Sequence, residues 1–595
     1  MSQQQNNDMQ QHFYRASAAD FGKIPGSPVV YWLKGKFAEV FDEKPIGNSS
    51  GINAAVGLFT CNNNIFMRAW QEVSFSNIEF NASESTKFDD KYWVPYNKGG
   101  PYRRWFGNIE FIVNYFDGGR LIREYRKSAG QSYSLPGECN YFKEGITWTD
   151  LTSGSLSVRY LPPSCIYDVS GHAASFESHN ELLKLLGYCN TKFVEISSKV
   201  LNTTFHFQVG DFKKLPYPTK LNLAHLPLIE NLVSISADDW NSLEVSLSFK
   251  RLHLNYIDVK QPYLNDTYAS CRSKWNKIAT EMQRLEEENN RIFIEAYGLQ
   301  DELTPEVPLS EITLTCNPHY RYGGNLTDDE REARLQSDTI AELISYAIGC
   351  MMGRYSLDRE GLVYAHAGNE GFKALVEEGA YATFAADDDG ILPLTSENWF
   401  SDDVAARIEA FVATVWGRES LEENLNFIAD SLTLNAIKPV KKGGETARET
   451  LRRYLSTQFY KDHLKTYKKR PIYWLFSSGK EKAFECLVYL HRYSESTLPR
   501  MRTEYVTPLL GQMASRIERK RMEQTEASTA EAKRIGKEID SLNKQLTELR
   551  AFDDLLKHHA DMRIQLDLDD GVKVNYGKFG TLLSDVKAIT GDKGE

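Results

Sequence analysis

The sequence lacks the features that would place the chain in a membrane or in an oxidising compartment. No run approaches the ~20 consecutive apolar residues that a transmembrane helix needs. The first residues, MSQQQNNDMQQ, have neither the basic nor the apolar region of a signal peptide. The eight cysteines are scattered, with no CxxC pair and no cysteine–histidine cluster at zinc-ligand spacing. We therefore expect a cytoplasmic protein with buried free thiols, no membrane contact and no metal.

Most catalytic motifs are missing as well. The sequence has no GxSxG elbow, no HExxH pair, no P-loop lysine, no G-x-G-x-x-G and no spaced carboxylates with a lysine of the kind that nucleases use to hold magnesium. The loop at residues 387–390, DDDG, resembles the start of a calcium loop but lacks the later ligands and the closing glutamate. We expect an acidic loop that caps a helix.

One segment approaches an enzyme motif. Asn317-Pro318-His319-Tyr320 follows a strand-like run at residues 311–315 and resembles the Asn/Asp-Pro-Pro-Tyr/Phe loop that holds a flipped adenine in N6-adenine methyltransferases. His319 replaces the second proline, and no glycine-rich turn for S-adenosylmethionine precedes it. We interpret the segment as a structural turn that Asn317 begins and in which Pro318 fixes φ. An autonomous enzyme built on these residues is the alternative.

Length and patterning predict an α+β protein of several parts. Of the 595 residues, 41% are hydrophobic and 25% charged, which is typical of a folded, water-exposed chain. Aromatic, glycine-rich and β-prone runs at residues 19–230, such as GNIEFIVNY at 107–115, predict a mixed α/β domain. We predict five segments: a disordered tail at 1–18, this domain at 19–230, a helical spacer at 231–300, a helical domain at 301–510, and a coiled-coil helix with a C-terminal tail at 511–595.

Helical periodicity marks the later segments. Apolar residues three, four and seven apart predict a long amphipathic helix over residues 267–298, and the pattern returns at 341–355 and 404–416. Near the C-terminus, five apolar residues alternate in steps of four and three: Ile535, Ile539, Leu542, Leu546 and Leu549. That spacing predicts a coiled-coil seam, which we expect to form an antiparallel hairpin with another long helix of the same chain or subunit.

Charge is strongly polarised along the chain although the net charge is −11. Residues 438–470 hold eleven Lys or Arg against three acids, and residues 387–423 hold ten acids against two bases. This pattern favours one surface that faces phosphate and others that face protein partners. Ordinary solvated helix faces are the alternative interpretation.

The best candidate for DNA contact is the segment at residues 91–108, KYWVPYNKGGPYRRWFGN. It has four cations, no acid and six aromatic residues, and its glycines would let the backbone approach phosphate. We select Lys98, Arg103, Arg104 and Trp105 as DNA-binding candidates. An aromatic-rich structural hairpin is the alternative.

Two further segments share this chemistry. KEGITWT at residues 143–149 places Lys143, Thr147 and Trp148 in a glycine-containing run. Residues 458–474 bring a cluster of cations to the end of a predicted helix at Pro471. In the second segment Lys468, Lys469 and Arg470 are candidates for contact with the DNA backbone, and a solvated basic turn is the alternative.

Long ordered blocks of this sequence resemble a known family. The blocks lie at residues 21–32, 94–108, 141–148, 210–218, 312–323, 346–358 and 452–480, so they cover nearly the whole chain. They are similar to the C-terminal half of PglX, the adenine-specific DNA methyltransferase of BREX phage-defence systems. The block GDFKKLPYP at 210–218 adds Lys213 and Lys214 to the DNA-binding candidates.

The resemblance implies a target recognition domain over residues 19–230 and a helical remainder that clamps DNA and packs on a catalytic domain. The family's cofactor pocket and Asn-Pro-Pro-Tyr loop lie in an N-terminal half that this sequence does not include. We therefore expect the chain to recognise a DNA site for an adenine methyltransferase, with no catalytic residue and no cofactor here and with S-adenosylmethionine bound by a separate catalytic half.

The expected partners are double-stranded DNA, that catalytic half, other BREX proteins and phage inhibitors that mimic DNA. A protein-interaction scaffold of the defence complex, with only secondary DNA contact, is the alternative function.

Overall fold

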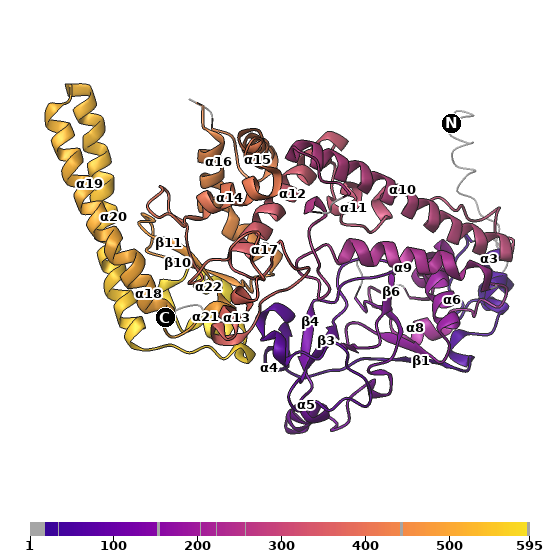
Figure 1. Cartoon of the computed structure of the whole chain (residues 1–595). Helices are drawn as coiled ribbons and strands as arrows, with labels where there is room; N and C mark the ends of the chain where they lie inside the picture. The colour runs from indigo at the N-terminus through magenta and orange to yellow at the C-terminus, as the bar shows by residue number, and fades with distance from the viewer. Residues whose placement is uncertain are drawn as a thin grey trace, which may run out of the picture. The chain divides into compact units, whose positions relative to one another are not determined.

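A computed structural model describes residues 18–33, 35–151, 155–202, 204–221, 223–255, 258–440 and 444–591. Apart from Ala18, the predicted tail at 1–18 lies outside these residues. The described chain forms two compact units, and each unit draws on three separate stretches (Figure 1). Unit 1 comprises residues 18–67, 78–247 and 273–325, and unit 2 comprises 68–77, 248–272 and 326–591.

Unit 1 contains two small sheets. The first has the antiparallel order β1 (Ile52–Ala55), β8 (Ala173–Phe176), β5 (Gly145–Trp148), β6 (Val158–Leu161). In the second, β3 (Trp93–Asn97) pairs antiparallel with β4 (Phe111–Asn114) and parallel with β7 (Ile166–Tyr167). Its order ends at β2 (Met67–Ala69), where the chain passes from unit 1 into unit 2. β4 lies within the run predicted as β-prone at 107–115.

The central strands of unit 1 are buried on both faces. Every residue of β3 and of β5 is buried, so neither strand shows the alternation of polar and apolar residues that a half-exposed strand has. The cost is that polar side chains in these strands must find partners inside the unit. This requirement governs the site described below.

Helices complete unit 1. They are α2 (Ala18–Lys23), α3 (Gly35–Glu39), α4 (Asn63–Phe66), α5 (Phe116–Ser128), α6 (His179–Cys189), α7 (Lys192–Leu201), α8 (Val209–Lys214), α9 (Leu226–Trp240) and α11 (Pro318–Arg321). α10 (Leu264–Tyr297) starts in unit 2 and continues into unit 1, and Gly298 follows it with φ of 67°. The helix predicted at 267–298 is thereby confirmed.

Unit 2 is mainly helical around one three-stranded sheet of order β10-β11-β9. The strands are β9 (Ile391–Pro393), β10 (Tyr473–Ser477) and β11 (Glu485–Tyr489). The helices are α12 (Asp328–Met351), α13 (Phe372–Glu377), α14 (Val404–Trp416), α15 (Leu421–Asn435), α16 (Ala447–Tyr454), α17 (Tyr460–Thr466), α18 (Thr497–Arg500), α19 (Thr507–Glu526), α20 (Thr529–Asp561), α21 (Val572–Gly577) and α22 (Val586–Thr590). The helix predicted at 404–416 is confirmed, and the one at 341–355 is the second half of α12, which ends earlier.

The predicted apolar seam lies on α20. All five of its residues are buried, and α20 runs beside α19, from which it is separated by two residues (Figure 1). The seam therefore packs against a helix of the same chain, while a true coiled-coil supercoil remains a prediction.

The acidic loop at 387–390 does not cap a helix, contrary to expectation. The Asp387 carboxylate accepts hydrogen bonds from the amides of Asp389 and Gly390, at 3.1 and 2.7 Å, in a turn that leads into β9. The expectation failed because the same short side chain that caps helices also closes a turn before a strand.

A ten-residue stretch between two parts of unit 1 belongs to unit 2. At its centre Glu72, which is buried, accepts hydrogen bonds from the Arg470 guanidinium at 2.7 Å and from the Val572 amide at 2.8 Å. Arg68 donates to the carbonyl of Asp569 at 3.0 Å, and His491 lies 2.9 Å from the carbonyl of Gln71. These contacts hold residues 68–77 among segments 398 to 501 positions further along the chain.

The molecule is a mixed α+β protein. Its two units do not follow the five predicted segments one for one, since unit 1 leaves out residues 68–77 and takes in 273–325. The segment boundaries therefore remain a prediction. No helix among the described residues is both long and apolar enough to cross a membrane. Six of the eight cysteines are buried as expected, Cys61 is partly buried, and Cys139 is exposed.

Candidate nucleic-acid interface

The loop that follows β3 has the shape that its glycines dictate. Gly99 and Gly100 have φ of 80° and 138°. A Cβ on Gly99 would lie 2.9 Å from the Ser170 carbonyl oxygen, and one on Gly100 would lie 2.8 Å from the Asn108 side chain. The Thr149 hydroxyl donates to the Gly100 carbonyl at 3.1 Å. Close packing of three chain segments thus requires glycine at both positions.

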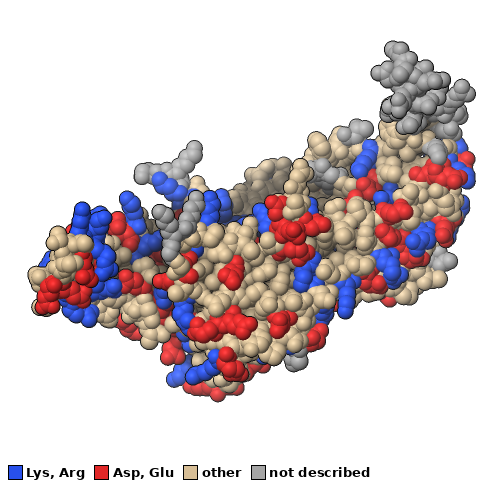
Figure 2. Space-filling model, turned by 90° about the horizontal axis from the view of Figure 1, so that it is seen from above, with Lys and Arg blue, Asp and Glu red and all other residues tan. Residues whose placement is uncertain are grey.

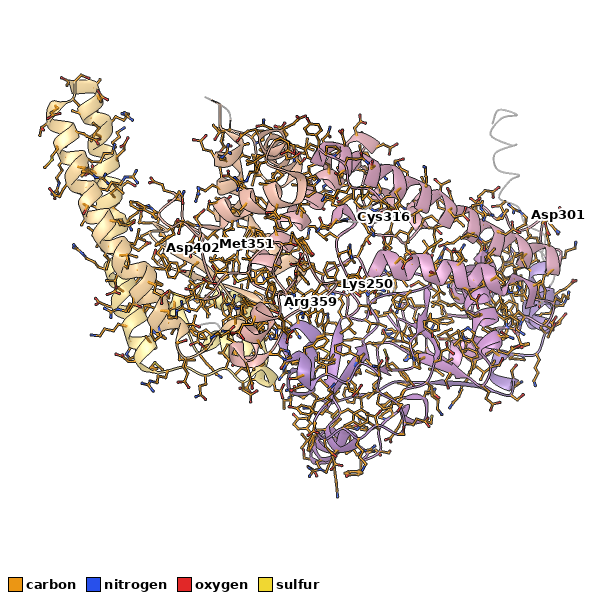
Figure 3. The ribbon with its side chains drawn as sticks, viewed as in Figure 1. Lys250, Asp301, Cys316, Met351, Arg359 and Asp402 are labelled. Carbon is orange, nitrogen blue, oxygen red and sulfur yellow. The ribbon has the colours of Figure 1, made fainter. Side chains whose placement is uncertain are left out.

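Arg103 points inward and forms a buried ion pair. Both terminal nitrogens donate to Asp239 Oδ2 on α9, at 3.2 and 3.3 Å, and the guanidinium lies over the Trp240 ring. The same carboxylate accepts from the Thr315 amide and hydroxyl, at 2.8 and 2.6 Å, and from the Cys316 amide at 3.0 Å (Cys316 is labelled in Figure 3). Burial raises the pKa of Asp239, but Arg103 and these hydrogen bonds outweigh it and hold the pKa below its usual value.

These bonds also explain why residues 311–315 are not a strand. The amide of Thr315 is directed at Asp239, and the Thr313 hydroxyl accepts from the Arg104 amide at 3.0 Å. Groups that a strand would pair with a neighbouring strand are therefore committed to a carboxylate and to a loop.

Arg104 and Trp105 are anchored to α10. Arg104 Nη1 and Trp105 Nε1 each donate to the Glu286 carboxylate at 2.8 Å, and Arg104 Nη2 lies 3.3 Å from Glu311. Burial, only partly offset by Arg104, raises the pKa of Glu286. Breaking such a buried pair from one side costs about 3–5 kcal/mol, because a charge is left without compensation. The two arginines and Trp105 therefore fix the loop to the helices of unit 1.

The candidates on β5 are buried too. The Thr147 hydroxyl accepts from the Asn97 amide at 2.6 Å and donates to the His172 carbonyl at 2.9 Å. Trp148 donates its indole N–H to the Phe207 carbonyl at 2.9 Å and stacks on Phe212. Neither side chain reaches the surface, because both link the strand to its neighbours.

The lysines among the unit 1 candidates do reach the surface. Lys98 is partly buried, while Lys143, Lys213 and Lys214 are exposed. Lys143 lies 3.2 Å from Glu84, and Lys214 lies 3.1 Å from Asp211. The Lys143–Glu84 pair is exposed on both sides and therefore weak, so Lys143 can exchange the carboxylate for a phosphate at little cost, whereas the carboxylate that Lys214 contacts is buried.

The candidates in unit 2 lie just after α17. Lys468 and Lys469 are exposed and have φ of 51° and 61° at the turn that ends the helix. Arg470, by contrast, pairs with the buried carboxylate of Glu72. Its guanidinium holds the 68–77 stretch in place, so only the two lysines present charge outward.

The oppositely charged runs of unit 2 neutralise each other in part. Arg448 of the basic run lies 2.9 Å from Glu409 and 2.6 Å from Glu422, both in the acidic run, and Arg452 lies 2.9 Å from Asp403. On the face shown in Figure 2, acidic and basic side chains are interspersed. Ion pairs within the unit thus neutralise part of the charge that is separated along the sequence. Neither interpretation of the sequence anticipated this.

One residue of this region escaped the sequence search. Arg159 on β6 is fully buried, and its guanidinium contacts the Arg103 carbonyl and the Thr149 hydroxyl. An arginine inside the apolar run VRYL was the available signal, since a cation in a buried strand needs compensating contacts.

The segment at Asn317 does not fit an adenine pocket. Asn317 begins α11, with Pro318 at the first helical position, and its Oδ1 accepts from the His319 amide at 3.1 Å. Its side-chain nitrogen donates to the carbonyls of Leu309 and Ile312, and the Tyr320 hydroxyl donates to the Tyr102 carbonyl. Because the groups that would hold a base are committed, the structural turn is confirmed. No cluster of metal-ligating side chains occurs among the described residues.

Comparison with known proteins gives two close matches. The chain is 48% identical over 579 residues to adenine-specific methyltransferase BrxX of Escherichia coli O9:H4 (strain HS). It is 36% identical over 590 residues to adenine-specific methyltransferase PglX of Lacticaseibacillus casei (strain Zhang). These methyltransferases are homologues of the chain. Each alignment covers 97% of this chain and 46% of the relative, so the chain spans about half the length of the curated relatives it matches. No protein-family model matches.

Proposed function

We propose that this chain is the DNA-recognition half of a PglX-like adenine-N6 DNA methyltransferase of BREX phage defence. The observation that carries the proposal is the match over 97% of the chain to two adenine-specific methyltransferases, of which it spans 46%. The turn at Asn317 offers no adenine pocket, which supports a catalytic half, with its S-adenosylmethionine, located in a polypeptide segment outside this sequence.

DNA contact in this proposal is made by lysines that reach the surface. We assign the partly buried Lys98 and the exposed Lys143, Lys213 and Lys214 in unit 1, and the exposed Lys468 and Lys469 in unit 2, to the DNA backbone and groove. The buried candidates Arg103, Arg104, Trp105, Thr147, Trp148 and Arg470 hold the segments that carry these lysines. The recognised site is short and is read in the major groove, while the catalytic half flips the adenine and transfers the methyl group.

The partners follow from the same proposal. They are double-stranded DNA, the catalytic half, other BREX proteins and phage proteins that mimic DNA, all met in the cytoplasm. A DNA mimic would compete for the same lysines, because it presents carboxylates where DNA presents phosphates.

Duplex binding at several salt concentrations tests the proposal. Fluorescence anisotropy with a labelled duplex should give a linear fall of log K with log salt concentration, and a variant lacking Lys98 and Lys143 should lose about 0.9 of slope for each phosphate contact removed. Lys373→Ala and Lys199→Ala, exposed lysines outside the proposed surface, are the matched controls. Binding that is absent or independent of salt would refute DNA recognition.

Methyl transfer tests the division of labour. The chain alone should transfer no tritiated methyl group to DNA, and adding a polypeptide that corresponds to the rest of the Escherichia coli relative should restore transfer. Activity of the chain alone, abolished by Asn317→Ala, would favour an autonomous enzyme instead.

An interaction scaffold is the second candidate. Exposed aromatic residues such as Tyr31, Trp32 and Phe205, at 51%, 49% and 68% exposure, favour it, because protein interfaces are rich in such side chains. In that case the lysine variants would leave complex formation and phage resistance intact.

A further inference from the structure

Arg159 is a buried cation without a counter-charge. It is 0% exposed, and among the described residues no carboxylate lies within ion-pair distance of its guanidinium. Nη1 donates to the Arg103 carbonyl and Nη2 to the Thr149 hydroxyl, both at 3.3 Å, whereas Nε has no hydrogen-bond partner. Burial and the nearby Arg103 lower the pKa of Arg159 to about 10, so the group stays charged at neutral pH.

Such an arrangement is costly in a protein interior. The desolvation of a charged group amounts to several kcal/mol even after relaxation, and a paired acid normally offsets it. Arg103, the neighbouring arginine, has that acid in Asp239. The guanidinium of Arg159 contacts only a backbone carbonyl and a hydroxyl oxygen. Its charge is therefore not neutralised, and it can act on a group that contacts Thr149.

A short chain of hydrogen bonds connects this charge to the surface loop. Arg159 Nη2 donates to Thr149 Oγ1, and the Thr149 hydroxyl donates to the carbonyl of Gly100, which is exposed. Lys98 lies two residues earlier in the same loop and is partly buried. The glycines add no open surface of their own, since a Cβ on either would meet Ser170 or Asn108. The loop therefore offers one partly exposed cation, and it contacts a hydroxyl that is bonded to a second, buried cation.

Two acids near the loop have neighbours other than Arg159. Asp150 lies 3.3 Å from His172 and 2.8 Å from His206. Asp168 accepts from the Tyr96 hydroxyl at 2.6 Å and from the Ser170 amide at 2.8 Å. Burial lowers the pKa of His172. Neither carboxylate is directed at Arg159.

We propose that Lys98 and Thr149 form a binding site for one DNA phosphate. On binding, the Thr149 hydroxyl turns its proton from the Gly100 carbonyl to the phosphate while it still accepts from Arg159, which thereby supplies buried positive charge to the site. Arg159 does not touch the DNA in this arrangement; it stabilises the phosphate through the intervening hydroxyl. The inference rests on the proposed DNA-recognition function and adds to it a residue that no surface search would select.

Charge removal in the full chain tests the site. Arg159→Met should weaken duplex binding about tenfold at low salt, since a unit charge within several ångströms acts strongly when little water intervenes. Arg159→Lys keeps the charge and should retain most of the affinity. The matched control is Arg126→Met: Arg126 is buried in the same unit and donates to the carbonyls of Phe59 and Ser132, away from this loop.

Methylphosphonate substitution identifies the phosphate. Each duplex in a series carries one neutral methylphosphonate, moved along the strand from one duplex to the next. At one position the wild-type chain should lose about tenfold in affinity and Arg159→Met should lose little. The reason is that the charge of Arg159 stabilises that phosphate, so removing either charge already removes their interaction. If Arg159→Met does not fold, Arg159→Lys and Thr149→Val take the same scan, and Thr149→Val should reduce the loss at that one position.

The outcomes separate the two proposals. If the wild-type chain binds no DNA, the proposed function fails. If it binds DNA, but Arg159→Met matches the wild type or loses affinity equally at every methylphosphonate position, the phosphate site is refuted while DNA recognition stands.

Discussion

The Arg103–Asp239 pair predicts an unequal response to the loss of its two members. Asp239→Asn keeps the size of the side chain but removes its charge, so Arg103 is left buried without compensation. The amide has one acceptor oxygen, whereas the carboxylate uses both: Oδ2 accepts from Arg103 and Thr315, and Oδ1 accepts from Cys316. At least one buried N–H therefore loses its acceptor as well.

The magnitudes follow from these contacts. A stranded buried charge costs about 3–5 kcal/mol, and a stranded N–H adds about 1–3 kcal/mol. Arg103→Met instead leaves Asp239 with its bonds to Thr315 and Cys316, so it should destabilise unit 1 by at least about 1 kcal/mol less than Asp239→Asn. In the double variant the loss should fall short of the sum of the single losses, because neither charge is stranded.

Hydrogen exchange measures the destabilisation caused by these variants in unit 1 alone. Because two units need not unfold in one transition, exchange of peptides from β3, β4 and α9 reports the opening free energy of unit 1 more directly than a melting curve does. Opening free energies for Arg103→Met equal to or lower than those for Asp239→Asn would refute the reasoning. Additive losses in the double variant would do so too.

Three further predictions concern unit 2. Burial and the neighbouring Asp389 raise the pKa of Asp387 to about 7. Between about pH 4 and 7 the folded state therefore binds more protons than the unfolded state, and the contribution of Asp387 to stability should fall as the pH rises through that range. Asp387→Asn should flatten that part of a curve of unfolding free energy against pH. Burial lowers the pKa of His463 to about 3, so stability should fall as pH drops below about 6.5; an unchanged acid limb in His463→Gln, followed by tryptophan fluorescence, would contradict this. Leu549→Ala, at a position with 0% exposure, should cost about 2–5 kcal/mol in urea unfolding, and Lys544→Ala, on the exposed face of α20, is the control.

The spacing of apolar residues predicted the long helices correctly, because tertiary packing buries the same face that the spacing defines. α10 and α14 appear where apolar spacing placed them, and the seam on α20 is buried. The strand-like run at 311–315 does not form a strand. Its residues are β-prone, but Asp239, more than 70 residues earlier, accepts a hydrogen bond from the Thr315 amide. A single sequence does not show such a distant partner.

The sequence did not predict how the side chains of the candidate segment are oriented. The segment from Lys98 to Trp105 forms a loop shaped by its glycines, but Arg103 and Arg104 turn inward to Asp239 and Glu286. Composition counts a cation wherever it occurs and cannot tell an ion pair with a distant helix from a phosphate contact. The lysine candidates of unit 1 are exposed or partly exposed, because a long, strongly hydrated side chain rarely lies inside a protein.

The contacts of the ten residues from Arg68 to Asn77 constrain the order in which the chain can fold during synthesis. A ribosome makes Glu72 early, yet Arg470 and Val572, which hold its carboxylate, emerge 398 and 500 residues later. At roughly 5–20 residues per second, that interval lasts on the order of a minute. Unit 1 likewise waits for residue 325 before α9 and its loop can close around Asp239. During translation the contacts around Glu72 and around Asp239 therefore form only after these distant segments have emerged.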